Sequence, residues 1–377
     1  MDQNNKRIDW LDGTKGILCI LIFIHHFLLI FFPAIHFGAS VPSYLYGVDT
    51  YLSQSPLSVI FNGNYMVALF CVISAVVISR NVMCIEDKSK LADTVAKRYF
   101  RLMLPLLGVG FVTYLFSQLG FFSNVEVGAL LKSPWAVAYY NDPISFGEFI
   151  SSSFIRTWFY GDSTLATSFW MLSKLFIGTF VCILMSLITW KYPKNAFVFY
   201  VFLILVYIDR SNLIFAFVLG TLIAWISVYS TKLFNRYAGI FALLLGVLLG
   251  GYPSGVEPTN FYKYISFLSY IDLHIIGAAL TIYGLFSCQV LQKLLSTKIF
   301  RWLGQISYSV YLIHILVLFS LSTAVYKLLI NYMGYYLSVG ISFVVSLAMI
   351  VCLSSLYQKY VERLCNKLQG KIFILLK

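Results

Sequence analysis

The stretch Gly16–Phe32, GILCILIFIHHFLLIFF, decides the fold class of this 377-residue chain. A helix that crosses a bilayer needs about 20 mostly apolar residues, and this run with its flanks is long enough. Two histidines, His25 and His26, interrupt the apolar run and are expected near the middle of the span. Ionisable groups at membrane depth are costly, so they need hydrogen-bond partners or a function. The stretch therefore predicts a first membrane helix that carries a polar site.

The composition of the whole chain also indicates a membrane protein. Apolar residues make up 60% and charged residues 11% of the chain, whereas soluble domains have about 45–50% and about 25%. Further apolar runs follow to the end of the chain, and the first run lacks a small-residue cleavage site, which argues against a signal peptide. The seven cysteines show no CxxC pair and no His-Cys metal spacing, so neither disulfides nor a metal site is expected.

The apolar runs between polar breaks predict an all-α, polytopic membrane helix bundle with about ten transmembrane helices. The expected ranges are 16–34, 57–79, 102–122, 167–189, 195–208, 212–228, 238–251, 265–291, 303–329 and 335–358. The longest polar stretch runs from Ser123 to about Ala166 and is expected to hold a partial helix or a re-entrant segment. We expect a single membrane domain over residues 1–377, with no appended soluble domain.

The distribution of basic residues predicts the orientation. With ten crossings and a cytoplasmic N-terminus, 21 of the 27 Lys and Arg residues fall in inner segments, five fall in outer segments, and Lys174 lies within a span. Such asymmetry predicts cytoplasmic N- and C-termini in a multi-pass protein of the cell membrane, expected to be a bacterial inner or plasma membrane. Because the basic residues are spread over many short loops, the net charge of +12 does not indicate a nucleic-acid partner. The oligomeric state is not predicted.

Three motifs follow one another along the chain. The first, RIDWLDGTKGILCILIFIHHF, contains LDG followed by Lys15 and then His26. The second combines FCVISAVVISRN with KRYFRLMLP, in which Arg98 and Arg101 form an RxxR pair ahead of Pro105. The third is FRWLGQISYSVYLIHILVL, which ends near His314. Each motif alone is weak, but the order and spacing of all three are fairly specific.

Together these motifs resemble the acyltransferase 3 family, integral-membrane enzymes that acylate surface glycans and other extracytoplasmic acceptors. The resemblance covers essentially the whole chain. It implies transfer of an acyl group, expected to be acetyl, from cytoplasmic acyl-CoA to a hydroxyl of an extracytoplasmic glycan or related acceptor. Acyl-CoA would be the donor substrate, and the glycan and the lipid bilayer would be the partners.

The resemblance also implies roles for four residues. His26 stands where the family has its histidine, and a neutral imidazole can take a hydroxyl proton near neutral pH. Its alternative is a histidine that is merely hydrogen-bonded inside a bundle. Arg98 and Arg101 share one helix face and suit the phosphates of CoA, although positive-inside bias also explains arginines there. Lys15, which replaces the family's usual Arg, is assigned to the same anion site or to topology marking.

Two positions depart from the family pattern. Ala75 stands where the family usually has Gly, and Leu175 falls where a glutamate of the motif WxLxxE would be. Asp162 and Asp272 are candidates to supply the missing acid, and the sequence does not rank them.

Several alternatives stay open. His25 points about 100° away from His26 on a helix and is expected to pack or to line a lumen, and the roles of His314 and Lys174 are undecided. A transporter of polysaccharide or lipid-linked sugar is the alternative function, because internal polar residues also mark transporters. A non-catalytic scaffold of the cell envelope is a third possibility.

Overall fold

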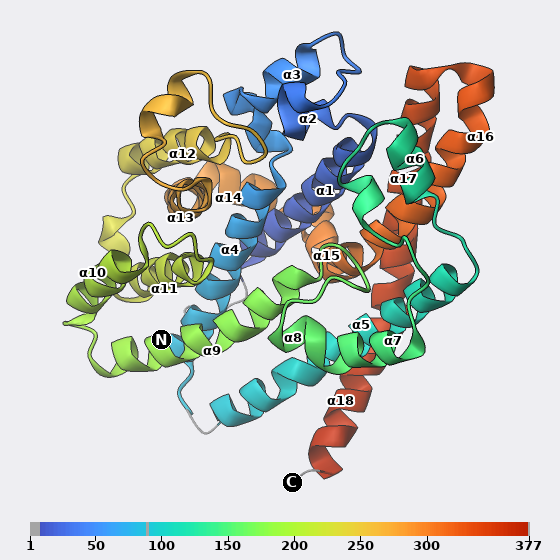
Figure 1. Ribbon diagram of the computed structural model, residues 1–377. Helices are drawn as coiled ribbons and strands as arrows, with labels where there is room; N and C mark the ends of the chain where they lie inside the picture. Colours follow the sequence, from blue (N-terminus) through green and yellow to red (C-terminus); the bar gives the residue numbers. More distant parts are fainter. Residues whose placement is uncertain (1–7, 88–89, 376–377) are drawn as a thin grey trace. The chain divides into compact units, whose positions relative to one another are not determined.

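A computed structural model describes residues 8–87 and 90–375 of the chain (Figure 1). Every regular element among these residues is a helix, and none is a strand, which confirms the all-α prediction. Four residues that the orientation argument counts as inner charges lie outside the described residues, namely Lys6, Arg7, Lys88 and Lys377.

Seven helical stretches of the described chain are long and apolar enough to cross a membrane. They are Asp9–Phe31, Gly63–Cys84, Val95–Gln118, Trp170–Lys191, Tyr270–Ser287, Lys298–Met333 and Tyr335–Lys371. Three further apolar helices coincide with predicted spans but contain only 12, 16 and 15 residues: α10 (Ala196–Tyr207), α11 (Ile214–Tyr229) and α12 (Arg236–Gly250). The total of about ten crossings and the cytoplasmic termini therefore stay predictions.

The chain divides into two compact units, each assembled from three separate parts of the sequence. The first unit contains the residues up to Ile22 together with Tyr51–Thr94 and Lys174–Gly304, and the second contains Phe23–Thr50, Val95–Ser173 and the residues from Gln305 onward. The units interleave along the chain, so neither is a separate stretch of sequence. The single membrane domain stays a prediction.

The first unit holds the beginning of α1 (Asp9–Phe31), the short helix η2 (Pro56–Ile60), and a group of longer helices. These are α4 (Gly63–Cys84), most of α9 (Trp170–Lys191), α10, α11, α12, α13 (Tyr270–Ser287) and α14 (Gln289–Leu295), with the short helices η5 (Thr231–Leu233) and η6 (Phe261–Ile265). Glycines let α12 and α13 approach closely, since a Cβ on Gly246 would lie 2.4 Å from Oγ1 of Thr281. Small residues at helix contacts are typical of membrane bundles.

Ala75, the first departure from the family pattern, lies at a similar close contact in this unit. It is fully buried on α4, and a Cβ on Gly220 of α11 would lie 2.5 Å from the Cβ of Ala75. The glycine that permits the close approach is therefore on α11, which explains how α4 accommodates alanine at this position.

The second unit holds the end of α1 and a larger number of short and long helices. They are α2 (Ala34–Phe37), η1 (Gly38–Ser40), the start of α3 (Val48–Ser53), most of α5 (Lys90–Gln118), α6 (Asn124–Leu130), η3 (Ala136–Ala138), α7 (Phe146–Ser151), η4 (Ser152–Arg156), α8 (Thr157–Phe159), most of α15 (Lys298–Val317), η7 (Leu318–Ser322), α16 (Thr323–Met333), α17 (Tyr335–Tyr357), η8 (Gln358–Glu362) and α18 (Arg363–Leu375). The predicted polar stretch contains α6 to α8, which confirms that it is partly helical (Figure 1).

Candidate active site

The two histidines of α1 lie close to the C-terminal end of that helix. The helix starts at Asp9, where acidic residues in the first turn favour a helix N-terminus, and it ends at Phe31, just before Pro33. His26 is thus five residues from the last residue of the helix, about 7.5 Å at 1.5 Å per residue. The helix begins seven residues before the apolar run, and the depth of His26 in the membrane stays a prediction.

His26 is paired with a second histidine from α15. Nδ1 of His26 lies 3.1 Å from Nε2 of His314, and the two rings stack with centroids 5.1 Å apart. His314 is fully buried, whereas His26 is partly exposed. The sequence left the role of His314 undecided, and the structure places it directly against the predicted catalytic residue.

The backbone of α15 determines which nitrogen of each ring carries a proton. Nδ1 of His314 lies 2.8 Å from the carbonyl oxygen of Tyr311. A carbonyl can only accept, so Nδ1 of His314 is the donor and Nε2 is the acceptor in the neutral ring. Nδ1 of His26 must then donate to His314, and this leaves Nε2 of His26 as the basic nitrogen. The pair therefore orients a base.

A third ring completes the site. The indole of Trp135 stacks on His26 with ring centroids 5.0 Å apart and planes inclined by 16°. Trp135 comes from the turn that precedes η3, and its ring also packs against Phe319 of η7. Nothing in the sequence singled out Trp135, because it lies in a polar stretch without periodicity.

His25 faces another direction, as expected from its position on the helix. It is largely buried, and its ring lies edge-on to His36 of α2, with centroids 5.7 Å apart. Burial lowers the pKa of His36 to about 4, so this ring is neutral at pH 7. The packing role predicted for His25 agrees with these contacts.

The two arginines lie in the same unit as the histidine pair. Arg98 and Arg101 both belong to α5, with Arg98 partly buried and Arg101 exposed. Next to them, the hydroxyl of Tyr308 donates to the carbonyl of Leu102 over 2.6 Å, which ties α15 to α5. Tyr308 precedes His314 by six residues, about 9 Å along the helix. Helix α15 therefore connects the arginine pair to the histidine pair.

Comparison with known proteins identifies the family. A family model described as an acyltransferase domain matches residues 8–357. The chain belongs to the acyltransferase 3 family. The match includes the helices that carry His26, Arg98 and His314. No curated protein and no solved structure matches the chain. Family membership supports acyltransferase activity in a multi-pass membrane protein.

Lys15, the third residue assigned to the anion site of this family member, forms an ion pair within its own helix. Its Nζ lies 2.7 Å from Oδ1 of Asp12, one turn earlier. Lys15 belongs to the first unit and the two arginines to the second. A contribution of Lys15 to donor binding stays a prediction. A phosphate bound by Lys15 would have to compete with the Asp12 carboxylate for the Lys15 ammonium group.

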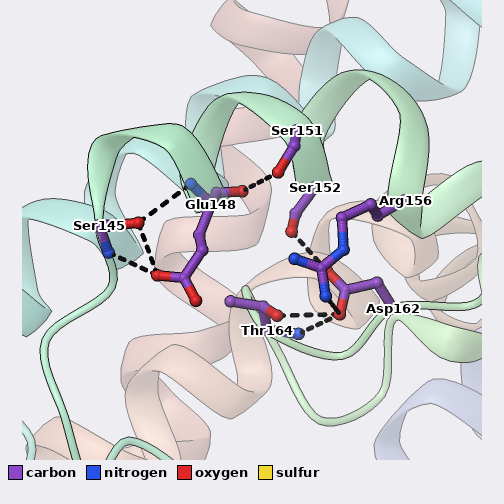
Figure 2. A network of polar contacts seen from close by, with 7 residues as sticks. All are labelled: Ser145, Glu148, Ser151, Ser152, Arg156, Asp162 and Thr164. Atoms are coloured by element: carbon purple, nitrogen blue, oxygen red, sulfur yellow. Dashed lines mark hydrogen bonds and ion pairs between the residues drawn. The ribbon is translucent and has the colours of Figure 1, made fainter.

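The two acids proposed to replace the family glutamate both have structural roles. Figure 2 shows Asp162 accepting hydrogen bonds from Ser152 and from Oγ1 of Thr164 at 2.8 Å, with Arg156 3.4 Å away. Asp162 thereby closes the turn after α8. Asp272 lies fully buried in the first turn of α13, where its carboxylate accepts from Oγ of Ser269 at 2.7 Å. These contacts hold each acid at a turn or a helix start, and a catalytic role for either acid stays a prediction.

A different acid, Glu362 at the end of η8, contacts the motif helix α15 in the second unit. Oε1 of Glu362 accepts a hydrogen bond of 2.5 Å from Oγ of Ser309 on α15, and Arg101 is close enough to interact with Glu362 electrostatically. Sequence reasoning missed Glu362, since it lies in a basic C-terminal segment that was assigned to topology. Lys174 is exposed near the start of α9, and no catalytic role is assigned to it.

Proposed function

We propose that this chain is a membrane O-acyltransferase that moves an acyl group, expected to be acetyl, from cytoplasmic acyl-CoA to a hydroxyl of an extracytoplasmic glycan or related acceptor. The observation that carries the proposal is the pair of His26 and His314, whose Nδ1 and Nε2 atoms lie 3.1 Å apart. In this pair the basic nitrogen of a partly exposed histidine is oriented by a buried one, within a chain that belongs to an acyltransferase family.

The chemistry that this base supports is acyl transfer to oxygen. Nε2 of His26 takes the proton of the acceptor hydroxyl while the hydroxyl oxygen attacks the carbonyl carbon of the thioester. The carbon–oxygen ester bond forms, the carbon–sulfur bond breaks, and the CoA thiolate takes up the proton from His26. A positioned general base contributes roughly 10²- to 10⁴-fold to the rate. Ester and free CoA are the products.

Arg98 and Arg101 are proposed to hold the CoA phosphates. Guanidinium groups bind phosphate oxygens through two parallel hydrogen bonds, which a lysine cannot reproduce. Both side chains project from one face of α5. Helix α15 contacts α5 through Tyr308 and also carries His314. Lys15 is proposed to add its positive charge to donor binding, with topology marking as its alternative role. In this arrangement the donor enters at the arginines and its thioester reaches toward His26.

The proposal is tested with membrane vesicles that contain the protein together with its native glycan. The vesicles receive acetyl-CoA labelled in the acetyl group, and we expect alkali-labile label in the glycan, whereas vesicles without the protein show none. His26→Ala at matched protein levels should remove the label. Glycan or lipid-linked sugar that crosses the membrane in a protein-dependent way, with no acetyl label, would favour the transporter alternative instead.

A further inference from the structure

The stacking of Trp135 on His26 brings together residues from distant parts of the second unit. The ring centroids are 5.0 Å apart and the planes are inclined by only 16°, so the indole lies nearly parallel to the imidazole. His314 contacts His26 at Nδ1. The two neighbours therefore act on different parts of the ring: His314 on the nitrogen and Trp135 on the face.

The position of Trp135 is determined by buried hydrogen bonds. Oγ of Ser133 donates to the carbonyl of Leu29 on α1 over 2.7 Å. Nδ2 of Asn124, which is fully buried, donates to the carbonyls of Ala136 and Tyr139, both at 2.7 Å. The Ser133 bond fastens the turn at Trp135 to the helix that carries His26, and the Asn124 bonds fasten it to α6, so the stacking is part of the folded framework.

The electronic character of an indole suits a ring that becomes charged. When His26 takes a proton from the acceptor, its imidazole becomes a cation. A cation over the face of a tryptophan, within about 6 Å of the ring centroid, is attracted by the negative face of the ring, and tryptophan is the strongest of the aromatic residues in this respect. The other titratable groups around this stack are His25 and His314 beside His26, and Tyr139 beside Trp135.

We propose that Trp135 is a positioning residue of the transfer reaction, whose indole face orients the ring of His26 and stabilises the imidazolium that forms as His26 takes the acceptor's proton. This inference rests on the proposed function. The interaction is stronger in the transition state than in the resting enzyme, because only then is His26 charged. Such interactions raise the catalytic rate without tightening donor binding.

The first test compares Trp135→Phe and Trp135→Leu with the unchanged protein in the vesicle assay. Trp135→Leu should lower the maximal transfer rate roughly 2- to 30-fold, which is the range that a cation–π contact supplies. Trp135→Phe should retain more activity, since it keeps a ring. The KM for acetyl-CoA should stay within about 2-fold in both variants.

The second test changes the electronics of the ring and keeps its shape. Protein in which the seven tryptophans are replaced by 5-fluorotryptophan has an indole with a weaker negative face. The maximal transfer rate should fall in the fluorinated wild-type protein, while fluorination of Trp135→Phe should have no effect. Fluorination leaves the packing of the wild-type protein unchanged and Trp135→Phe keeps a ring at this position, so this test decides the question even if Trp135→Leu fails to fold.

Equal maximal rates for wild-type protein and Trp135→Leu would overturn the inference, as would fluorination that slows both backgrounds equally. Failure of the proposed function gives a different result, namely transfer that survives His26→Ala. Transfer that requires His26 but is insensitive to the ring electronics of Trp135 refutes only this inference.

Discussion

Nδ1 of His26 lies 3.1 Å from Nε2 of His314, although 288 residues separate the two in the sequence. The carbonyl of Tyr311 holds His314 in the tautomer that accepts from His26. Two motifs of the family thus meet in one hydrogen bond, and the bond determines which nitrogen of His26 is basic. A histidine can play this orienting role because its two nitrogens differ in protonation.

His314→Ala should slow transfer and leave donor binding unchanged. The change removes the acceptor for Nδ1 of His26, and leaving such a group unsatisfied costs roughly 1–3 kcal/mol, which corresponds to a loss of roughly 5- to 150-fold. His314→Gln should retain more activity, because its amide oxygen can accept from His26. The measurement is the maximal transfer rate and the KM for acetyl-CoA. Unchanged rates in His314→Ala would show that His26 is oriented without His314.

Arg98→Ala or Arg101→Ala should weaken binding of acetyl-CoA. Each change removes a charge-assisted hydrogen bond worth roughly 1.5–3 kcal/mol, so the Kd should rise roughly 10- to 150-fold. Lysine should restore only part of the affinity. Arg236→Ala, at the exposed start of α12, is the matched control for loss of one positive charge. If Arg98→Ala and Arg101→Ala bind acetyl-CoA as tightly as the wild type and Arg236→Ala do, both arginines serve only as topology markers.

Gly304→Ala should destabilise the protein. A Cβ on Gly304 would lie 2.2 Å from the backbone oxygen of Asp12, far inside van der Waals contact, and such overpacking costs roughly 1–3 kcal/mol. Gly340→Ala is the control, because nothing lies within 4 Å of its added Cβ and alanine favours a helix. Thermal unfolding in detergent should show a lower midpoint for Gly304→Ala only. Equal midpoints would mean that the backbone of Asp12 does not lie this close to Gly304.

His36 should make the protein sensitive to acid. Burial lowers the pKa of His36 in the folded protein to about 4, below the ordinary value of 6.5, so the unfolded chain binds a proton first as the pH falls. The stability contribution is present above pH 6.5 and is lost as the pH falls toward 4. The slope of the free energy of unfolding against pH reports the number of protons taken up on unfolding. In His36→Phe this number should be smaller by up to one between pH 6.5 and 4. An identical dependence in both proteins would contradict a lowered pKa of His36 in the folded protein.

The positions of the helices could be predicted from the sequence, since apolar runs between polar breaks report directly on membrane helices. The number of spans could not, because α10, α11 and α12 have only 12, 16 and 15 residues. The start of the first helix could not be predicted from the apolar run alone, since the LDG motif is part of α1 and the helix begins at Asp9, before that run.

The site was only partly predictable. His26, Arg98 and Arg101 could be found from motif spacing, but the hydrogen bond between His26 and His314 could not, because sequence gives no distances across a bundle. The contact of Trp135 with His26 could not be predicted either, since the position of Trp135 depends on the hydrogen bonds made by Ser133 and Asn124.

The measurement that tests the central claim most directly is transfer of labelled acetyl groups to native acceptor in membranes that carry His26→Ala or His25→Ala at matched levels. His26→Ala should lose transfer, by roughly 10²- to 10⁴-fold or more, while acetyl-CoA still binds. His25→Ala should keep most activity, because its ring packs against His36. Full activity in His26→Ala would contradict the account.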